Sequence, residues 1–301
     1  MEFYILYYIS NMCLTKFYNK VNNCNEGTFY DKDYFDEIIN EDFDAYYTDE
    51  NQNKKILFKF RKNIINTELA DIATKVFKSH SKGAHNNRGF ASGTFHDGRV
   101  RTVVNKTSRA KNSASNISGY FDKPYQQIQS YFKTKTVCRT TQFTRDNKLL
   151  FDSSIAFFQS INDNYKLLAP YDYIRQNNYI QDIRPSMRIN NTVFTTITSN
   201  YNWRTAAHKD IGDFEDGLGN LTITGDELWD GCYLGFPEYK VAINVRKGDF
   251  LLMDVHQLHC NTEIDINNGT RLSFVCYLRK NMVLCNTKKI IKGETFYYHK
   301  K

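Results

Sequence analysis

Two histidines and one aspartate stand at spacings that suit a metal site. His208 and Asp210 are two residues apart, so on an extended chain their side chains share one face. His259 follows 49 residues after Asp210, at the end of another predicted strand. Two imidazoles and one carboxylate form the facial triad that holds non-haem Fe(II) and leaves positions open for dioxygen and a bidentate co-substrate. We therefore predict that these three residues are metal ligands.

Arginines near these ligands are candidates for binding the co-substrate. Arg271 begins a predicted strand 12 residues after His259, and its planar guanidinium matches a carboxylate with two parallel hydrogen bonds. We expect it to bind the distal carboxylate of 2-oxoglutarate. Arg204, four residues before His208, either pairs with the other carboxylate of 2-oxoglutarate or forms a structural ion pair. For Arg279, at the far end of the strand that Arg271 begins, a surface role is favoured.

Two residues next to His259 are alternative ligands. His256 is three residues before His259, so in a strand the two rings face opposite sides; we favour His259 as the ligand and leave His256 a supporting or substrate-facing role. Cys260 would offer a thiolate. Neighbouring side chains on a strand point to opposite faces, however, which disfavours Cys260 as a ligand beside His259.

Residues 195–280 resemble the oxygenase domain of the TET/J-binding-protein family. The resemblance rests on residues 207–210 (AHKD), 258–262 (LHCNT) and 270–277 (TRLSFVCY), and upstream on residues 87–93 (NRGFASG) and 118–122 (SGYFD). Members of this family hydroxylate the methyl group of thymine or 5-methylcytosine in nucleic acid. The resemblance implies an Fe(II)/2-oxoglutarate-dependent dioxygenase that uses dioxygen and acts on nucleic acid, with DNA favoured. His259 matches the distal histidine ligand of the family.

Two other classes of function stay open. The same iron chemistry could act on a prolyl or lysyl side chain of a protein or on a small molecule, because the loops that set specificity are the least transferable part of a fold. A non-catalytic binding module that keeps only the barrel is disfavoured, since the set of metal ligands is intact.

Charge is distributed unevenly along the chain. Residues 1–50 carry eleven acidic residues against three lysines, whereas residues 75–123 carry ten Lys/Arg against two aspartates. Cationic loops rich in Ser, Asn and Gly suit a phosphate backbone, although they could equally balance the acidic segment. The predicted nucleic-acid-binding residues are Lys82, Arg88, Arg99, Arg101, Lys106, Arg109 and Lys111. For a base in duplex DNA, which must be flipped into the pocket, Asp213, Phe214, Trp229 and Tyr233 are available to read it.

Short strands separated by turns dominate the chain from about residue 190. Segments 193–198, 221–224, 241–245, 249–253 and 272–278 are β-branched, aromatic or apolar, and this spacing indicates a double-sheet jelly roll. The resemblance specifies a cupin-like double-stranded β-helix. We expect an α+β fold with this core at about 190–285 and an N-terminal elaboration of helices and loops. Residues 55–80 read as helical, with Thr67 as the N-cap of 68–77, and a second helix is predicted over 152–164.

The domain boundaries and the cellular context follow from composition. We expect residues 1–60 to form an acidic segment, either inside or outside the fold, and residues 61–301 to form the dioxygenase domain. Seven cysteines without a CxxC pair favour free thiols in a reducing compartment. The apolar run at residues 3–9 is too short to span a bilayer, and Glu2 stands where a signal peptide is positively charged. We expect a soluble intracellular protein that is not secreted and has no membrane partner, whether nuclear, cytoplasmic or viral.

Overall fold

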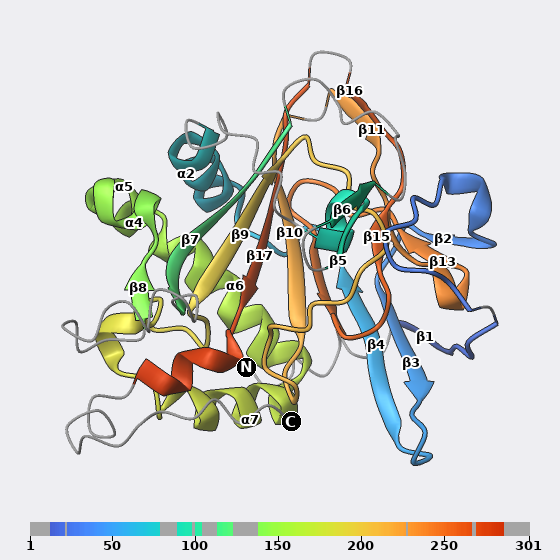
Figure 1. Ribbon diagram of the computed structural model, residues 1–301, viewed down its shortest axis with the longest axis horizontal. Helices are drawn as coiled ribbons and strands as arrows, with labels where there is room; N and C mark the ends of the chain where they lie inside the picture. The colour runs from blue at the N-terminus through green and yellow to red at the C-terminus, as the bar shows by residue number, and fades with distance from the viewer. Residues whose placement is uncertain are drawn as a thin grey trace, which may run out of the picture.

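A nine-stranded mixed sheet forms the centre of the computed structural model, which describes residues 13–21, 23–78, 89–97, 100–103, 113–122, 138–226, 228–266 and 269–285. The strand order is β1-β3-β4-β14-β10-β17-β9-β7-β8 (Figure 1). The strands are β1 (Leu14–Phe17), β3 (Phe43–Thr48), β4 (Lys54–Arg61), β14 (Phe250–Met253), β10 (Gly219–Gly225), β17 (Arg271–Tyr277), β9 (Thr196–Tyr201), β7 (Ala114–Asp122) and β8 (Cys138–Thr140).

A smaller, four-stranded sheet packs against this one in the order β15-β12-β13-β2. Its strands are β15 (Cys260–Asn261), β12 (Leu234–Phe236), β13 (Val241–Ile243) and β2 (Glu37–Ile39). Two further pairs, β11 (Trp229–Gly231) with β16 (Ile264–Ile266) and β5 (Thr94–Asp97) with β6 (Val100–Val103), complete the strands. Side chains of both sheets, such as Phe58 and Phe236, share one apolar core. Two facing sheets around a common core are the predicted double-stranded β-helix, which is confirmed.

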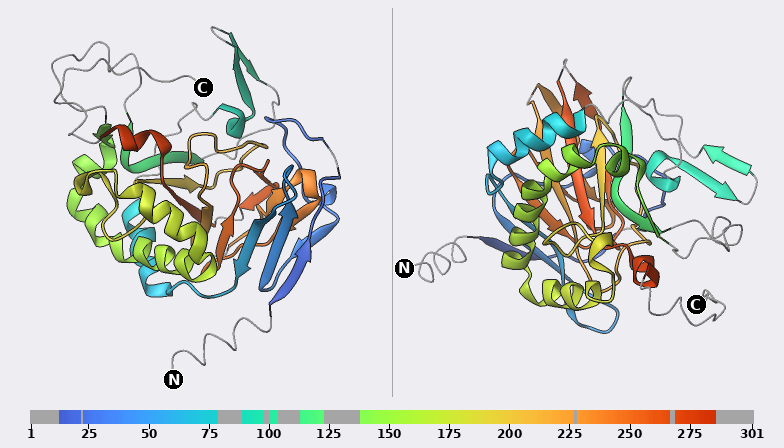
Figure 2. Two further views of the ribbon diagram at one scale, coloured as in Figure 1. Left: turned by 90° about the horizontal axis from the view of Figure 1, so that it is seen from below. Right: turned by 90° about the vertical axis from the view of Figure 1, so that its left-hand side faces the viewer.

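Alternation along the strands lets the large sheet bury both faces. On β14, Leu251 and Met253 enter the core between the sheets, whereas Phe250 and Leu252 enter a second core under the helices. The helices that cover this second face (Figure 2) are α2 (Thr67–Lys78), α4 (Gln142–Asp146), α5 (Lys148–Ser153), α6 (Ile155–Leu168) and α7 (Pro170–Ile180). The sheet is thus held between a helical layer and the smaller sheet.

Phe274 of β17 anchors the helical layer to the sheet. Its ring meets those of Phe77, Phe157 and Phe158 edge to face, with centroids 5.1, 5.3 and 5.9 Å apart. Such pairs contribute about 0.5–1.5 kcal/mol each beyond the burial of their area. Because Arg271 and Ser273 lie on the opposite face of the same strand, this packing also fixes the strand that carries them.

The predicted helices need two corrections. Helix α2 begins at Thr67, and it is the side chain of Asn66 that accepts a hydrogen bond from the Leu69 N–H at 3.1 Å, so the cap is one residue earlier than predicted. Residues 55–61, expected to be helical, belong instead to strand β4, which lies between β3 and β14. The helix predicted at 152–164 is found as α6, three to four residues further along.

Much of the acidic N-terminal segment is built into the fold. Strands β1 and β3 extend the large sheet, and β2 pairs with β13 in the small one. The division at residue 60 stays a prediction, and the apolar run at 3–9 lies outside the described residues. Among the cysteines, Cys13, Cys24, Cys232, Cys260 and Cys276 are free, as expected, whereas Cys138 is disulfide-bonded.

Candidate functional site

His208 and His259 are brought together by the main chain. The His208 N–H donates to the His259 carbonyl at 3.0 Å, and the His259 N–H donates back to the His208 carbonyl at 3.1 Å. His259 immediately precedes β15, and His208 follows two fully buried alanines, Ala206 and Ala207. The two imidazole centroids are 4.4 Å apart. Because the two residues are paired in one antiparallel bridge, their imidazole rings lie side by side on the same side of the backbone.

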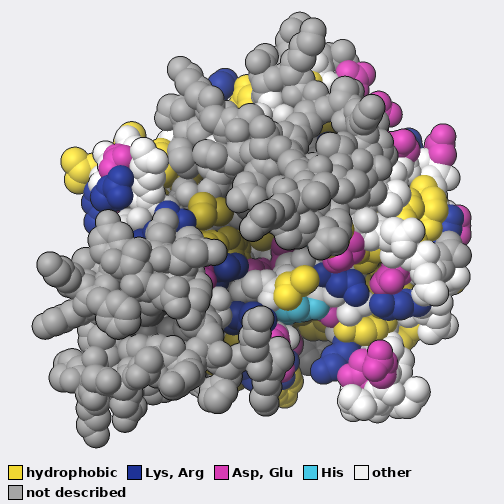
Figure 3. All heavy atoms as spheres, in the orientation of Figure 1, with side chains coloured by type: hydrophobic (Ala, Val, Ile, Leu, Met, Phe, Trp, Pro, Cys, Tyr) yellow, Lys and Arg dark blue, Asp and Glu magenta, His cyan; other side chains and the backbone are white. Residues whose placement is uncertain are grey.

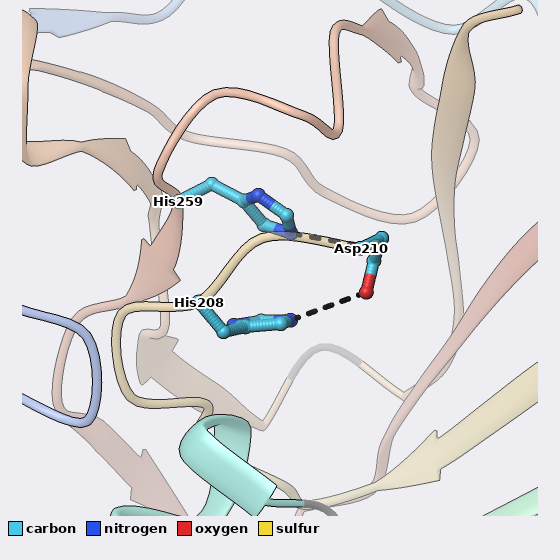
Figure 4. Close-up of side chains that lie close together, drawn as sticks. All are labelled: His208, Asp210 and His259. Atoms are coloured by element: carbon cyan, nitrogen blue, oxygen red, sulfur yellow. Dashed lines mark ion pairs between the residues drawn. The ribbon is translucent and has the colours of Figure 1, made fainter. Parts of the chain in front are cut away.

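Asp210 completes a group of three ligand atoms (Figure 4). Its two carboxylate oxygens lie 3.7 Å from Nε2 of His208 and 3.7 Å from Nε2 of His259, and all three ligand atoms lie within 4.8 Å of one another. These separations are too long for hydrogen bonds. A single ion between the three groups can contact all of them.

Hydrogen bonds at the other ring nitrogens set the tautomers. Nδ1 of His208 lies 2.8 Å from the Ala206 carbonyl, and Nδ1 of His259 lies 3.0 Å from the Gln257 carbonyl. A carbonyl only accepts, so each Nδ1 carries the proton, and each Nε2 presents a lone pair toward Asp210. This is the arrangement in which protein histidines bind metals.

The two alternative ligands, His256 and Cys260, make other contacts. Nδ1 of His256 lies 3.2 Å from Oδ1 of Asp254, and the other oxygen of that carboxylate accepts a hydrogen bond from the Tyr47 hydroxyl at 2.7 Å. Cys260 is buried in an apolar cluster, and burial raises the pKa of its thiol to about 12, so it stays protonated. Neither residue belongs to the group of three.

A cleft of about 930 Å³ opens beside the three ligand residues, which all line it. Most of its other polar side chains are neutral hydroxyls and amides from β7, β9 and the segments around them: Ser115, Asn116, Thr141, Gln142, Asn147, Thr198, Asn200, Thr205 and Asn261. The register places Ser115, Asn200 and Ser273 side by side on three adjacent strands. Sequence reasoning did not single out these residues, because only the strand pairing puts them on one wall.

Arg271 is buried, with 1% of its surface exposed. Its Nη1 donates to the Ser273 hydroxyl at 3.2 Å, and Ser273 lines the cleft. Among the described residues, its Nε and Nη2 have no hydrogen-bond partner. Burial, together with nearby Arg246, lowers the pKa of Arg271. A buried guanidinium with two free donors on one edge is costly unless an anion pairs with it, and a carboxylate fits that edge bidentately.

Arg204 is engaged in structural contacts. It forms an ion pair with Asp31, donates to the carbonyls of Tyr30 and Asn261, and stacks on the Phe29 ring at 4.8 Å. Of the two alternatives for Arg204, these contacts favour the structural ion pair, and its role toward a co-substrate stays a prediction. Residues 203–206 lie outside any strand, since β9 ends at Tyr201, so the four-residue spacing between Arg204 and His208 does not place the two side chains on one strand face.

Arg279 lines the cleft rather than an outer surface. It pairs with Asp122 through Nε and stacks on the Phe121 ring at 4.1 Å. Asp213 bridges to Arg279 through the main chain and also lines the cleft. Burial and the charge of Asp210 raise the pKa of Asp213 well above its usual range, against the opposing effect of Arg279.

None of the three aromatic residues that were available to read a base lines the cleft. The Phe214 ring packs on Tyr179, the Trp229 ring lies 4.3 Å from the guanidinium of Arg246 and 5.4 Å from that of Arg271, and Tyr233 is buried beside Arg246. The predicted cationic residues Lys82, Arg88, Arg99, Lys106, Arg109 and Lys111 lie outside the described residues, and Arg101 lies in β6, whose side chains are not described. Two cations that the set omitted, Arg139 and Lys209, line the cleft and are exposed.

The fold and the site define an oxygenase of the 2OGFeDO superfamily. Residues 116–280, more than half of the chain, match the Tet_JBP family, described as the oxygenase domain of that superfamily. The chain belongs to this family. The matched range holds all three candidate metal ligands and Arg271.

Curated relatives extend well beyond the matched region. The chain is 40% identical over 170 residues to the bifunctional helicase and thymine dioxygenase JBP2 of Leishmania braziliensis, which covers 56% of this chain and 14% of that protein. It is 32% identical over 195 residues to the thymine dioxygenase JBP1 of Crithidia fasciculata, covering 63% and 23%. The chain thus spans less than a quarter of the length of these relatives.

A solved structure of NgTET1 in complex with 5mC DNA has the same fold. The TM-score is 0.58 at 16% identity, and the match covers 94% of this chain and 92% of the other. In the part of the chain that the structure describes, no helix combines the length and the apolar character needed to cross a membrane.

Proposed function

We propose that this chain is an Fe(II)- and 2-oxoglutarate-dependent dioxygenase that hydroxylates the methyl group of thymine or 5-methylcytosine in nucleic acid, with DNA as the favoured substrate. The observation that carries the proposal is the convergence of two Nε2 lone pairs and one carboxylate on a single point. The similarity to the JBP1 and JBP2 thymine dioxygenases supports the choice of substrate.

The residues present fit the metal and the co-substrate. His208, Asp210 and His259 would hold Fe(II) from one side, because two neutral imidazoles and a carboxylate are the donor set that this ion takes in such sites. Arg271 would bind the far carboxylate of 2-oxoglutarate through the two donors that have no partner among the described residues. Fe(II) and 2-oxoglutarate, when bound, supply the means to place one oxygen of dioxygen on a C–H bond and the other in succinate.

The chain itself orients these groups and the substrate. The Ala206 and Gln257 carbonyls keep both Nδ1 protons in place, so that the rings cannot present the wrong nitrogen. Ser273, which lines the cleft, accepts a hydrogen bond from Nη1 of Arg271, whereas Arg271 itself is buried behind that wall with its Nε and Nη2 donors unpaired among the described residues. Neutral amides and hydroxyls on the cleft wall suit a nucleobase, which offers donors and acceptors without charge.

Mass spectrometry of nucleosides tests the proposal. The purified chain would be incubated with Fe(II), ascorbate, 2-oxoglutarate and DNA that contains thymine and 5-methylcytosine, and succinate would be followed in parallel. We expect a thymine or 5-methylcytosine nucleoside that has gained one oxygen, in amounts that match succinate. Succinate formed only with a protein or a small molecule would overturn the choice of substrate, and no succinate with any substrate would overturn the proposed activity.

A further inference from the structure

Ile211 presents an apolar side chain at the mouth of the cleft. It directly follows Asp210 and is 68% exposed. Among the described residues, no other large apolar side chain that lines the cleft is exposed. A single exposed aliphatic residue is ordinary on a protein surface. An exposed isoleucine directly beside a candidate metal ligand, however, calls for an explanation.

The main chain on both sides of Ile211 is fixed. The Asp210 N–H donates to the Val255 carbonyl at 3.0 Å, and the Lys280 N–H donates to the Gly212 carbonyl at 3.1 Å. Gly212 packs closely on Arg279, so that an added Cβ would lie 2.1 Å from Nη1 of that side chain. The backbone on either side of Ile211 is therefore held in place by its neighbours. A β-branched side chain is also stiff about χ1.

Basic and apolar side chains meet at this mouth. Lys209, on the other side of Asp210, is exposed and lines the cleft. Arg279, on which Gly212 packs, also lines the cleft, and Figure 3 shows Lys and Arg side chains on both sides of the histidine exposed on this face. A stiff apolar tip flanked by cations suits a ligand that has a charged backbone and stacked flat rings.

We propose that Ile211 inserts into the base stack of duplex DNA beside the nucleotide that enters the cleft. The inference rests on the proposed function and specifies how a paired base is taken out. Extruding a base costs unstacking and unpairing energy, and aliphatic side chains such as isoleucine are used elsewhere to occupy opened base steps. Burial of the Ile211 side chain in that gap would offset part of this cost, and it would do so only when the substrate is paired.

Ile211→Ser tests the inference on two substrates. The kcat/KM would be measured on one oligonucleotide as a duplex and as a single strand. We expect the duplex-to-single-strand ratio to fall by about tenfold or more for the variant, since an isoleucine side chain fully buried against the bases would be lost. Ile211→Leu, which keeps an apolar tip, should retain most of the wild-type ratio. The thermal midpoint of each variant would show that the fold is kept.

Leu149→Ser is the matched control, because Leu149 is 85% exposed on α5 and does not line the cleft. Its ratio should equal that of the wild type. An Ile211→Ser ratio equal to that of the wild type, whether both rates fall together or neither changes, would overturn the inference while the proposed function stands. Absence of any modified base with the wild-type chain on either form of DNA would instead refute the proposed function, and the inference would fall with it.

Discussion

His208 and His259 exchange main-chain hydrogen bonds in both directions, at 3.0 and 3.1 Å, and their rings stand 4.4 Å apart. The backbone thus holds the two residues side by side, and the hydrogen bonds at Nδ1 turn both Nε2 atoms toward Asp210. A site arranged in this way can bind a metal without reordering the chain, because the free-energy cost of bringing the ligands together arises during folding.

Removal of either histidine should abolish tight metal binding. For His208→Ala and His259→Ala we expect the affinity for Co(II) or Mn(II), as substitutes for Fe(II), to fall by more than about 100-fold, since even supporting residues around metal ligands contribute 10- to 100-fold. Titration followed by calorimetry measures this. His256→Ala serves as the control, because that ring pairs with Asp254 outside the group of three. An equal loss in His256→Ala would contradict the assignment of His259.

Substitution of Arg271 and substitution of Arg204 should have different effects on the KM for 2-oxoglutarate. For Arg271→Met we expect the KM for 2-oxoglutarate to rise roughly 100-fold, because a charge-assisted bidentate pair is lost. Trp229, whose ring lies 5.4 Å from the Arg271 guanidinium, offers a fluorescence signal for binding that does not depend on turnover. Arg204→Met should lower the thermal midpoint and leave this KM within a few-fold. The reverse pattern would assign the co-substrate to Arg204.

Arg139 and Lys209 should contribute to DNA affinity through charge alone. Both are exposed on the cleft, and within the described residues neither takes part in an ion pair. Arg139→Ala and Lys209→Ala should each weaken DNA binding regardless of sequence and reduce the slope of log K against log salt by about 0.9, the value expected for one phosphate contact. Lys166→Ala, on the exposed side of α6, should leave the slope unchanged. Slopes that do not change in the first two variants would remove these residues from the interface.

The Asp254–His256 pair should make stability depend on pH in two windows. The hydrogen bond to Asp254 raises the pKa of His256, against the effect of burial, so its contribution is full below the ordinary histidine pKa and is lost as pH rises through the raised value. Although burial opposes ionisation of Asp254, hydrogen bonds from His256 and Tyr47 hold its pKa below the ordinary value. That contribution is present above the ordinary aspartate pKa and is lost as pH falls through the lowered value.

His256→Gln should therefore destabilise the fold mainly between these two windows, by on the order of 1 kcal/mol. Denaturant unfolding of the metal-free wild type and variant from pH 3 to pH 9 measures the difference. We expect the two curves of unfolding free energy to converge at high pH, where His256 is neutral in both states. A constant difference across the range would show that the ring stabilises by packing rather than by charge. Asp210, whose charge also acts on His256, is the same in both proteins.

The candidate ligands could be singled out from the sequence because the proposed chemistry needs only a few residue types at family-typical spacings, and the structure brings the three together, while their role as ligands stays a prediction. His208, Asp210, His259 and Arg271 were each identified from residue type and from the strand that follows or precedes it. The core strands were predictable for a related reason, since segments such as 250–253 are apolar throughout and too short for a helix.

Features that depend on distant pairing could not be predicted. Strand β4 lies inside the large sheet because it pairs with β14, almost 200 residues away. No local pattern in residues 54–61 indicates that partner. Arg204 contacts Asp31 and the Tyr30 carbonyl, more than 170 positions away, and no local pattern around Arg204 indicates those partners. The roles of Ile211, Arg139 and Lys209 depend on the cleft, which exists only after β7, β9 and β17 have paired.

Isotope labelling tests the central claim most directly. The purified chain would turn over DNA under ¹⁸O₂ with Fe(II) and 2-oxoglutarate, and the mass of succinate and of the modified nucleoside would be measured. The account predicts one labelled oxygen in succinate and one in the hydroxymethyl group of thymine or 5-methylcytosine, with both signals lost in His259→Ala. Succinate that carries no label, or label that enters neither base, would contradict it.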